Sequence, residues 1–115
     1  MGYLEKVYEN ALFYELIKAG FIVEQQKPIQ VVYDGVVVGD FVADLVVKGL
    51  IIIELKATNS LTPVFNAICL NYLKATGLPL CLLLNFGTSA LQIKRLEQLP
   101  KIFHIWTCAN ANNVF

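Results

Sequence analysis

The chain has 115 residues, which is enough for one domain with its own hydrophobic core and leaves no room for two. Lysine and arginine number nine, as do aspartate and glutamate, and this neutrality argues against nucleic-acid binding through a general basic field. Apolar residues make up 57% of the chain, above the usual share for soluble domains, so we expect exposed apolar surface that a homo-oligomer would cover.

The first half of the chain predicts a helix followed by a hairpin. Apolar residues recur at helical spacing over residues 3–19, and Gly20 stands where a glycine that ends a helix is expected. Residues 21–33 and 36–47 are predicted as strands. Asp34-Gly35 between them is the strongest short hairpin signal in the sequence.

A third strand is predicted over residues 50–57, after a tight turn at Lys48-Gly49. Its apolar start indicates burial on both faces. A second helix follows and ends near Thr76, with Thr62 as its cap and Pro63 at its first helical position.

The last part of the chain predicts a fourth strand at residues 80–86, which is too apolar for an exposed edge. Residues 91–96 and 102–107 are candidates for short additional strands. The order is therefore αβββαβ, which predicts an α/β (α+β) fold with a mixed four-to-five-stranded sheet flanked by helices. We expect one domain over residues 1–107 and a frayed tail at 108–115.

Cysteine usage and hydropathy point to a cytoplasmic protein. Cys69, Cys81 and Cys108 include no C-x-x-C pair, so reduced thiols are expected rather than a zinc or redox motif. The longest apolar stretch, residues 78–86, is too short to span a bilayer, and no signal peptide is visible.

Three ionisable residues are predicted to meet on the second and third strands. Glu54 and Lys56 alternate with Leu55, so they share one face about 7 Å apart. A hairpin through Lys48-Gly49 would place Asp44 near Ile53, one position from Glu54. Charged groups on so apolar a strand cost free energy unless they are paired or bind something.

The residue types suit a divalent metal. Two neighbouring carboxylates, Asp44 and Glu54, repel each other unless a cation lies between them, and Mg²⁺ (or Mn²⁺) prefers such oxygen ligands. The Leu55 carbonyl could supply a further oxygen, and Lys56 could orient a water or stabilise developing charge. These parts suit hydrolysis of a phosphodiester. The alternative is a salt bridge between Glu54 and Lys56, with Asp44 as a turn residue.

The spacing of Asp44, nine residues and Glu54-Leu55-Lys56 resembles the PD-(D/E)XK nuclease superfamily, whose common core also has the order αβββαβ. The segment Gly2-Tyr3-Leu4-Glu5-Lys6-Val7-Tyr8 is similar to the signature of the bacterial and archaeal GxxExxY family. Further matching stretches are Ala43-Asp44-Leu45, Leu61-Thr62-Pro63-Val64 and Asn71-Tyr72-Leu73-Lys74. The similarity covers roughly residues 2–96. Relatives usually have another helix ahead of the Gly2 signature, at which this chain starts.

The resemblance implies magnesium-dependent cleavage of DNA or RNA, with Asp44 and Glu54 as metal ligands and Lys56 as the catalytic lysine. Superfamily nucleases often add a carboxylate from the first helix, for which Glu5 and Glu9 are the candidates. The alternative for both is an ordinary charge near a helix start. Glu15, a third candidate on that helix, is predicted to be a buried structural residue.

Departures from the family pattern support a second hypothesis. Ala43 replaces the proline of the superfamily name, Ile68 stands where a Gln is common and Phe65 where a His is common. The last two would remove polar groups from the rim of the site. The alternative function is a catalytically degenerate module that binds nucleic acid or a protein partner as an oligomer.

Other polar and aromatic residues have plainer interpretations. Tyr8 and Tyr72 are expected to pack rather than to touch substrate, and Lys74 and Lys94-Arg95 to lie on solvated faces. Asn85 is either a polar element of the site or a turn residue.

Overall fold

The computed structural model of the chain describes residues 3–98. Its elements are α1 (Tyr3–Lys18), β1 (Val23–Tyr33), β2 (Val36–Val47), β3 (Ile51–Lys56), α2 (Pro63–Thr76), β4 (Leu80–Asn85) and β5 (Gln92–Glu97). This confirms the predicted αβββαβ order, with one of the two candidate additional strands as β5. The other, at 102–107, and the tail at 108–115 lie outside the described residues. No helix in the described range is long and apolar enough to cross a membrane.

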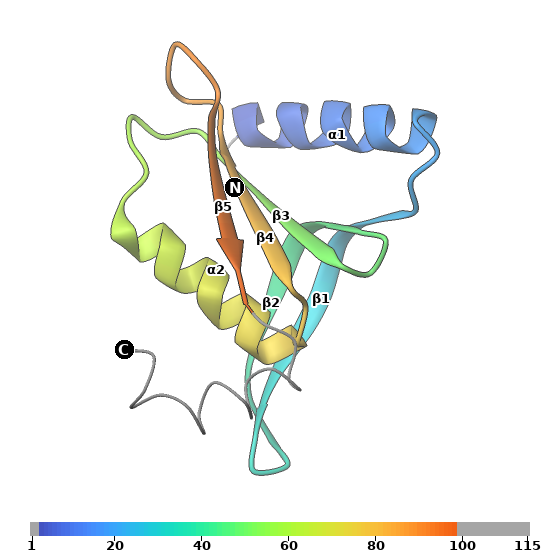
Figure 1. Cartoon of the computed structure of the whole chain (residues 1–115), viewed down its shortest axis with the longest axis vertical. Coiled ribbons are helices and arrows are strands. Elements are labelled where there is room, and N and C mark those ends of the chain that lie inside the picture. Colours follow the sequence, from blue (N-terminus) through green and yellow to red (C-terminus); the bar gives the residue numbers. More distant parts are fainter. Residues whose placement is uncertain (1–2, 99–115) are drawn as a thin grey trace, which may run out of the picture.

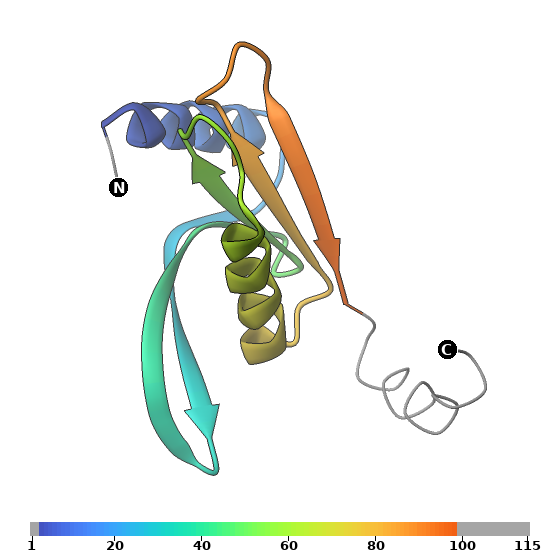
Figure 2. The same ribbon diagram turned by 90° about the vertical axis from the view of Figure 1, so that its left-hand side faces the viewer.

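The five strands form one mixed sheet in the order β1-β2-β3-β4-β5 (Figure 1). β3 and β4 are parallel and are joined by the crossover helix α2, whereas the other neighbouring strands are antiparallel. β4 therefore lies between β3 and β5, as its apolar sequence predicted. The β1–β2 hairpin extends well beyond the other strands (Figures 1 and 2).

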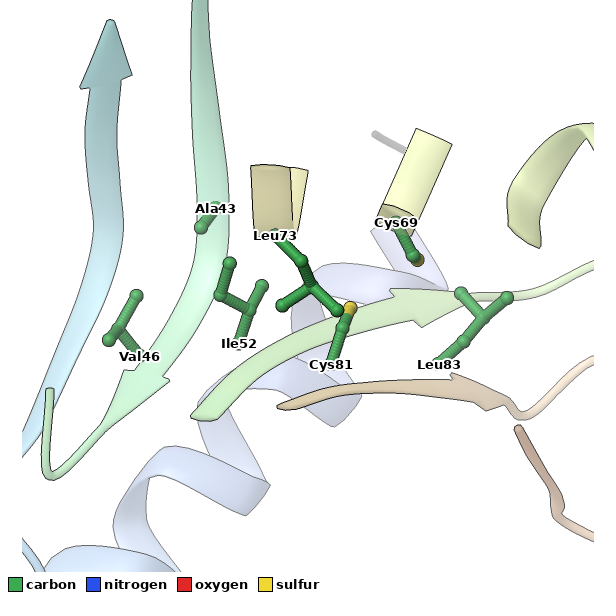
Figure 3. Packing of buried hydrophobic residues seen from close by; sticks show 7 residues of the cluster. All are labelled: Ala43, Val46, Ile52, Cys69, Leu73, Cys81 and Leu83. Atoms are coloured by element: carbon green, nitrogen blue, oxygen red, sulfur yellow. The ribbon is translucent and has the colours of Figure 1, made fainter. Parts of the chain in front are cut away.

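The two helices cover opposite faces of the sheet (Figures 1 and 2). Under α2 lies a buried cluster of Ala43, Val46, Ile52, Cys69, Leu73, Cys81 and Leu83 (Figure 3). Under α1 lies a second cluster of Leu45, Val47, Ile53, Leu55 and Leu84, against which Leu12, Phe13 and Leu16 pack. The sheet is thus buried on both faces around β3, which explains why that strand begins with three isoleucines.

The ends of α2 follow from local sequence. Thr62 is the N-cap in an extended conformation, and Pro63 takes the first turn, where its missing N–H costs nothing. The Thr62 hydroxyl makes no capping hydrogen bond; instead its carbonyl accepts the Phe65 N–H at 3.1 Å. The helix ends at Gly77, whose φ of 73° is the left-handed conformation that favours glycine.

The turn between β2 and β3 is one residue longer than predicted. Lys48 and Gly49 both have positive φ, 57° and 65°, as a type I′ turn requires. The Leu50 N–H closes the turn on the Val47 carbonyl at 3.0 Å. Leu50 stays outside the ladder, and pairing starts between Val47 and Ile51.

This extra residue corrects the predicted register. Leu45 pairs with Ile53, so the next position along places Asp44 opposite Glu54 and not near Ile53. Directly opposed residues of antiparallel strands share a face, whereas a slip of one residue would send the side chains to opposite faces. The turn therefore allows the two carboxylates to meet.

Candidate active site

Both neighbouring ladders are interrupted at Asp44. β1 and β2 pair regularly on either side, through Gln25 with Leu45 and Lys27 with Ala43, but Gln26 and Asp44 do not pair. Gln26 has a φ of 52°, a left-handed conformation that is costly for a residue with a side chain. β2 and β3 pair only from Val47 to Leu45. The backbone groups around Asp44 are consequently free for other partners.

The interruption also reverses the side-chain alternation of β2. Leu45 and Val47 pack under α1, whereas Ala43 and Val46 both pack under α2. A regular strand would send Ala43 to the same face as Leu45. Asp44 lies at the reversal, where the strand passes from one core to the other.

Asp44 and Glu54 bond to the backbone of each other's strand. The Asp44 N–H donates to Glu54 Oε1 at 3.2 Å, and the Leu55 N–H donates to Asp44 Oδ2 at 2.9 Å. Both side chains are buried, with 5% and 6% of their residue surface exposed. The structure therefore brings together the two carboxylates that the sequence singled out.

Burial favours the protonated forms of Asp44 and Glu54. It raises the pKa of Glu54 from 4.5 to about 9, and the charge of Asp44 adds to the rise. Burial also raises the pKa of Asp44, opposed chiefly by the hydrogen bond from the Leu55 N–H. The charged forms of both adjoining carboxylates are therefore disfavoured unless a cation compensates them.

Lys56 follows on the same strand and lies toward α2. Its Nζ is 5.3 Å from the centre of the Phe65 ring, at a distance typical of cation–π contact. Its positive charge lowers the pKa of Glu54 against the larger effect of burial. Within residues 3–98, Glu54 and Lys56 form no salt bridge, and Glu54 bonds to the β2 backbone instead.

Glu9 reaches the pair through a glutamine that the sequence did not single out. Glu9 is fully buried and is bound by Lys6 at 3.0 Å and by Gln26 at 2.7 Å; Gln25 also donates to it. The Gln26 amide lies 3.4 Å from Asp44 Oδ1 as well, so Gln26 bridges the two carboxylates. The only sequence feature that could have indicated this role of Gln26 is the pair of successive glutamines in an otherwise alternating strand.

The other two glutamates of α1 differ from Glu9. Glu5 accepts the Ala57 N–H at 3.3 Å, so it contacts the chain just beyond Lys56 and not the Asp44–Glu54 pair. The prediction that Glu15 is a buried structural residue is wrong: its side chain is 61% exposed and pairs with Lys18. Leu12, Phe13 and Leu16 face the sheet, which turns Glu15 toward solvent.

Asn85 holds in place the chain segment that follows Lys56. Its Oδ1 accepts the N–H groups of Thr58 and Gly87, each at 3.0 Å, and its Nδ2 donates to the Thr58 carbonyl and to Gln92. Gly87 packs so closely that an added Cβ would lie 2.3 Å from the Thr58 N and O atoms. Asn85 is therefore a satisfied structural residue that holds the chain after Lys56 in place.

The donor set fits a magnesium ion. One oxygen of each carboxylate in the pair lies outside the two backbone bonds described above. Leu55, whose N–H bonds to Asp44, offers its carbonyl as a further candidate oxygen. No cluster of three His, Cys, Asp or Glu side chains poised for a metal occurs in the described range, but Mg²⁺ is commonly held by one or two carboxylates, with water completing its shell.

Comparisons with known proteins bear on the family and the fold. A family model described as the PD-(D/E)XK nuclease superfamily matches residues 1–96. The fold is similar to the crystal structure of SSO0001, with a TM-score of 0.62 and 15% identity, covering 93% of this chain and 57% of that one. It is also similar to the alkaline exonuclease LHK-Exo from Laribacter hongkongensis, with a TM-score of 0.60 and 15% identity, covering 93% and 62%. This chain spans less than two thirds of either protein, and no curated protein matches it.

Proposed function

Because this chain belongs to the PD-(D/E)XK nuclease superfamily, we propose that it hydrolyses nucleic-acid phosphodiesters with Mg²⁺ or Mn²⁺ as cofactor. The observation that carries the proposal is the buried Asp44–Glu54 pair, in which each side chain is held by the opposite strand. Lys56 next to it supplies a cation on the same face. A structural salt bridge would not leave two buried carboxylates side by side.

Each residue has a distinct part in this proposal. Asp44, Glu54 and the Leu55 carbonyl would hold the ion, which when bound lowers the pKa of a coordinated water and polarises a phosphoryl oxygen. Lys56 stabilises the negative charge that builds up on the phosphate. Glu9 fixes the orientation of Asp44 through Gln26, and Glu5 fixes the chain at Ala57.

The test is a cleavage assay with end-labelled DNA and RNA in Mg²⁺ or Mn²⁺. The wild-type protein should cleave, and chelation should stop it. Asp44→Asn, Glu54→Gln and Lys56→Ala should each lower the rate by at least about 100-fold, as expected for groups that act on the transition state. Lys18→Ala, a change in an exposed lysine of α1, is the matched control and should cleave normally. Cleavage that survives in Glu54→Gln would overturn the proposal.

One observation favours the second function, a catalytically degenerate module. On α2, the Phe65 ring already engages Lys56, and Ile68, three residues further along, is apolar and 37% exposed. Neither offers a polar group to a substrate. If the wild-type protein binds Mg²⁺ but cleaves no substrate in either metal, this second function replaces the first.

A further inference from the structure

A groove lies beside the candidate active site, between α2 and the β1–β2 hairpin. Its volume is about 440 Å³, comparable to the pockets that hold small ligands. Val31, Val32 and Phe41 line it from the hairpin, and Asn71, Tyr72 and Lys74 line it from α2. We call it the α2–hairpin groove. Its walls are mainly apolar, with one cation and one amide among them.

Two aromatic rings form the part of the groove nearest the site. Phe41 and Tyr72 are stacked, with ring centres 3.8 Å apart and planes at 9°. Each ring therefore covers one face of the other, and both residues line the groove. A nucleic-acid base can extend such a stack on an outer face, since every base has a π-face.

Tyr72 lies between the groove and the candidate active site, since it packs against the same buried cluster as Phe65, the residue that Lys56 contacts. Burial raises the pKa of Tyr72 to about 12, and the charge of Glu54 adds to the rise, so the hydroxyl lies in the field of the carboxylates. Phe65, which contacts Lys56, precedes Tyr72 by two helical turns on the same side of α2. The rise of the helix puts these two positions about 10 Å apart along its axis, or roughly three stacked nucleotides of one strand at about 3.4 Å each.

The distribution of charge argues against a duplex in this groove. The chain is neutral, and Lys6, Lys18, Lys27 and Arg95 are each paired with a carboxylate. A duplex is held mainly by several lysine and arginine contacts to phosphates. Along this side of α2 the described cations are Lys56 and Lys74, which suit one or two phosphates of a single strand.

We propose that the α2–hairpin groove binds an unpaired base two or three nucleotides from the scissile phosphate, so that the substrate is single-stranded nucleic acid. The base extends the Phe41–Tyr72 stack on an outer face, Val31 and Val32 contact it from the hairpin, and Lys74 contacts the adjoining phosphate. This inference rests on the proposed nuclease function, because it names the substrate class of that same site.

The test measures binding of a short fluorescent oligothymidine by anisotropy, without divalent metal, against a duplex of the same length. The single strand should bind at least about tenfold more tightly, because its unpaired bases can stack on the aromatic rings and the paired bases of a duplex cannot. The affinity should fall only weakly with salt, with a slope no greater than about two phosphates would give.

Three variants connect the binding to the groove. Asn71→Trp fills the space from an exposed helical position and should weaken binding about tenfold. Tyr72→Leu removes one ring and should do the same, whereas Tyr72→Phe keeps the stack and should bind normally. Tyr14→Ala removes a tyrosine that is 63% exposed on α1 and is the matched control. Circular dichroism establishes that each variant is folded.

The experiments distinguish a failure of this inference from a failure of the proposed nuclease function. Glu54→Gln should abolish cleavage but bind the oligothymidine as the wild type does. Cleavage of a duplex in preference to a single strand, or unchanged binding in Asn71→Trp, would overturn this inference and leave the proposed nuclease intact. Single-strand binding by a wild-type protein that cleaves nothing would instead remove the proposed hydrolysis.

Discussion

Asp44 and Glu54 hold each other in position across two strands. The Asp44 N–H donates to the Glu54 carboxylate at 3.2 Å, while the Asp44 carboxylate accepts the amide that follows Glu54, at 2.9 Å. Each side chain thus replaces a ladder bond at the point where regular pairing stops. The atoms that would bind a metal are the same ones that close the end of the sheet.

The Asp44–Glu54 pair predicts metal binding that can be measured without an activity assay. Calorimetric titration of the wild-type protein with Mg²⁺ or Mn²⁺ should show one saturable site. Asp44→Asn keeps an acceptor for the Leu55 N–H but loses the charge, so the heat of binding should disappear. Asp40→Asn changes an exposed aspartate of the same strand and should bind as the wild type does. Equal binding by Asp44→Asn would exclude a metal site here.

Stability in chelator should depend on pH through Glu54. Its pKa is raised from 4.5 to about 9 in the folded protein, so folding favours the protonated form. The contribution to stability is complete below pH 4.5 and is lost as the pH rises toward 9. Each pKa unit corresponds to about 1.4 kcal/mol, so a decrease of a few kcal/mol is expected in urea unfolding between pH 5 and pH 9.

Glu54→Gln should remove most of this pH dependence, because the amide resembles the protonated carboxyl. The variant should therefore be more stable than the wild type at pH 9. Glu15→Gln, an exposed change on α1, serves as the control and should follow the wild-type curve. Parallel curves for wild type and Glu54→Gln would show that Glu54 is ionised in the folded protein across this range.

Gln26 should affect metal affinity without being a ligand. Gln26→Ala removes the amide that joins Glu9 to Asp44. Loss of a residue that orients a ligand typically costs about 10–100-fold in metal affinity, and Mn²⁺ titration should show a loss in this range. Gln30→Ala, at an exposed position of the same strand, should have no effect.

The backbone at Gln26 allows a second measurement. Because its φ is 52°, Gln26→Gly should be more stable than Gln26→Ala by about 1 kcal/mol, while both lose the amide. Thermal unfolding of the two variants separates the conformational cost from the lost hydrogen bonds. Equal stability would mean that the positive φ carries no strain.

Gly87 should be intolerant of a side chain. Gly87→Ala would place a Cβ 2.3 Å from backbone atoms of Thr58, so either the β3–α2 segment or the β4–β5 turn must shift. Overpacking of this kind costs about 1–3 kcal/mol, measurable by denaturant unfolding. Gly39→Ala is the control, since its Cβ would come no closer than 4.0 Å to Val31. A fully stable Gly87→Ala protein would contradict the tight packing described here.

The element order was predictable because each element carries its own local signal. The Asp34-Gly35 pair specifies the hairpin, and Pro63 and Gly77 mark the two ends of α2. Apolar runs predicted which strands are buried. Family resemblance and chain order together then indicated that Asp44, Glu54 and Lys56 belong to one site.

Two features could not be predicted from the sequence. Asp44 faces Glu54 because Lys48 adopts a positive φ and Leu50 stays outside the ladder. The same sequence is equally compatible with a two-residue turn, which would give a different register. Gln26 reaches Asp44 because the hairpin register shifts between Val31 and Val32. Both outcomes depend on one-residue irregularities, which leave no periodic signal.

The homo-oligomer predicted from the apolar composition and the single domain over residues 1–107 stay predictions. Exposed apolar side chains do occur in the β1–β2 hairpin, where Tyr33 and Val36 are 74% and 61% exposed. Size-exclusion chromatography with light scattering would measure the oligomeric state directly.

The reversal at Asp44 has a consequence for identifying distant relatives. Ala43, before Asp44, packs toward α2 at an odd position, whereas Val46, after Asp44, does so at an even position. A two-residue period fitted across the whole of β2 would therefore assign half of the strand to the wrong layer. Sequences that share this site should show the phase change at the aspartate itself, and that change of phase is a marker independent of the acidic residue.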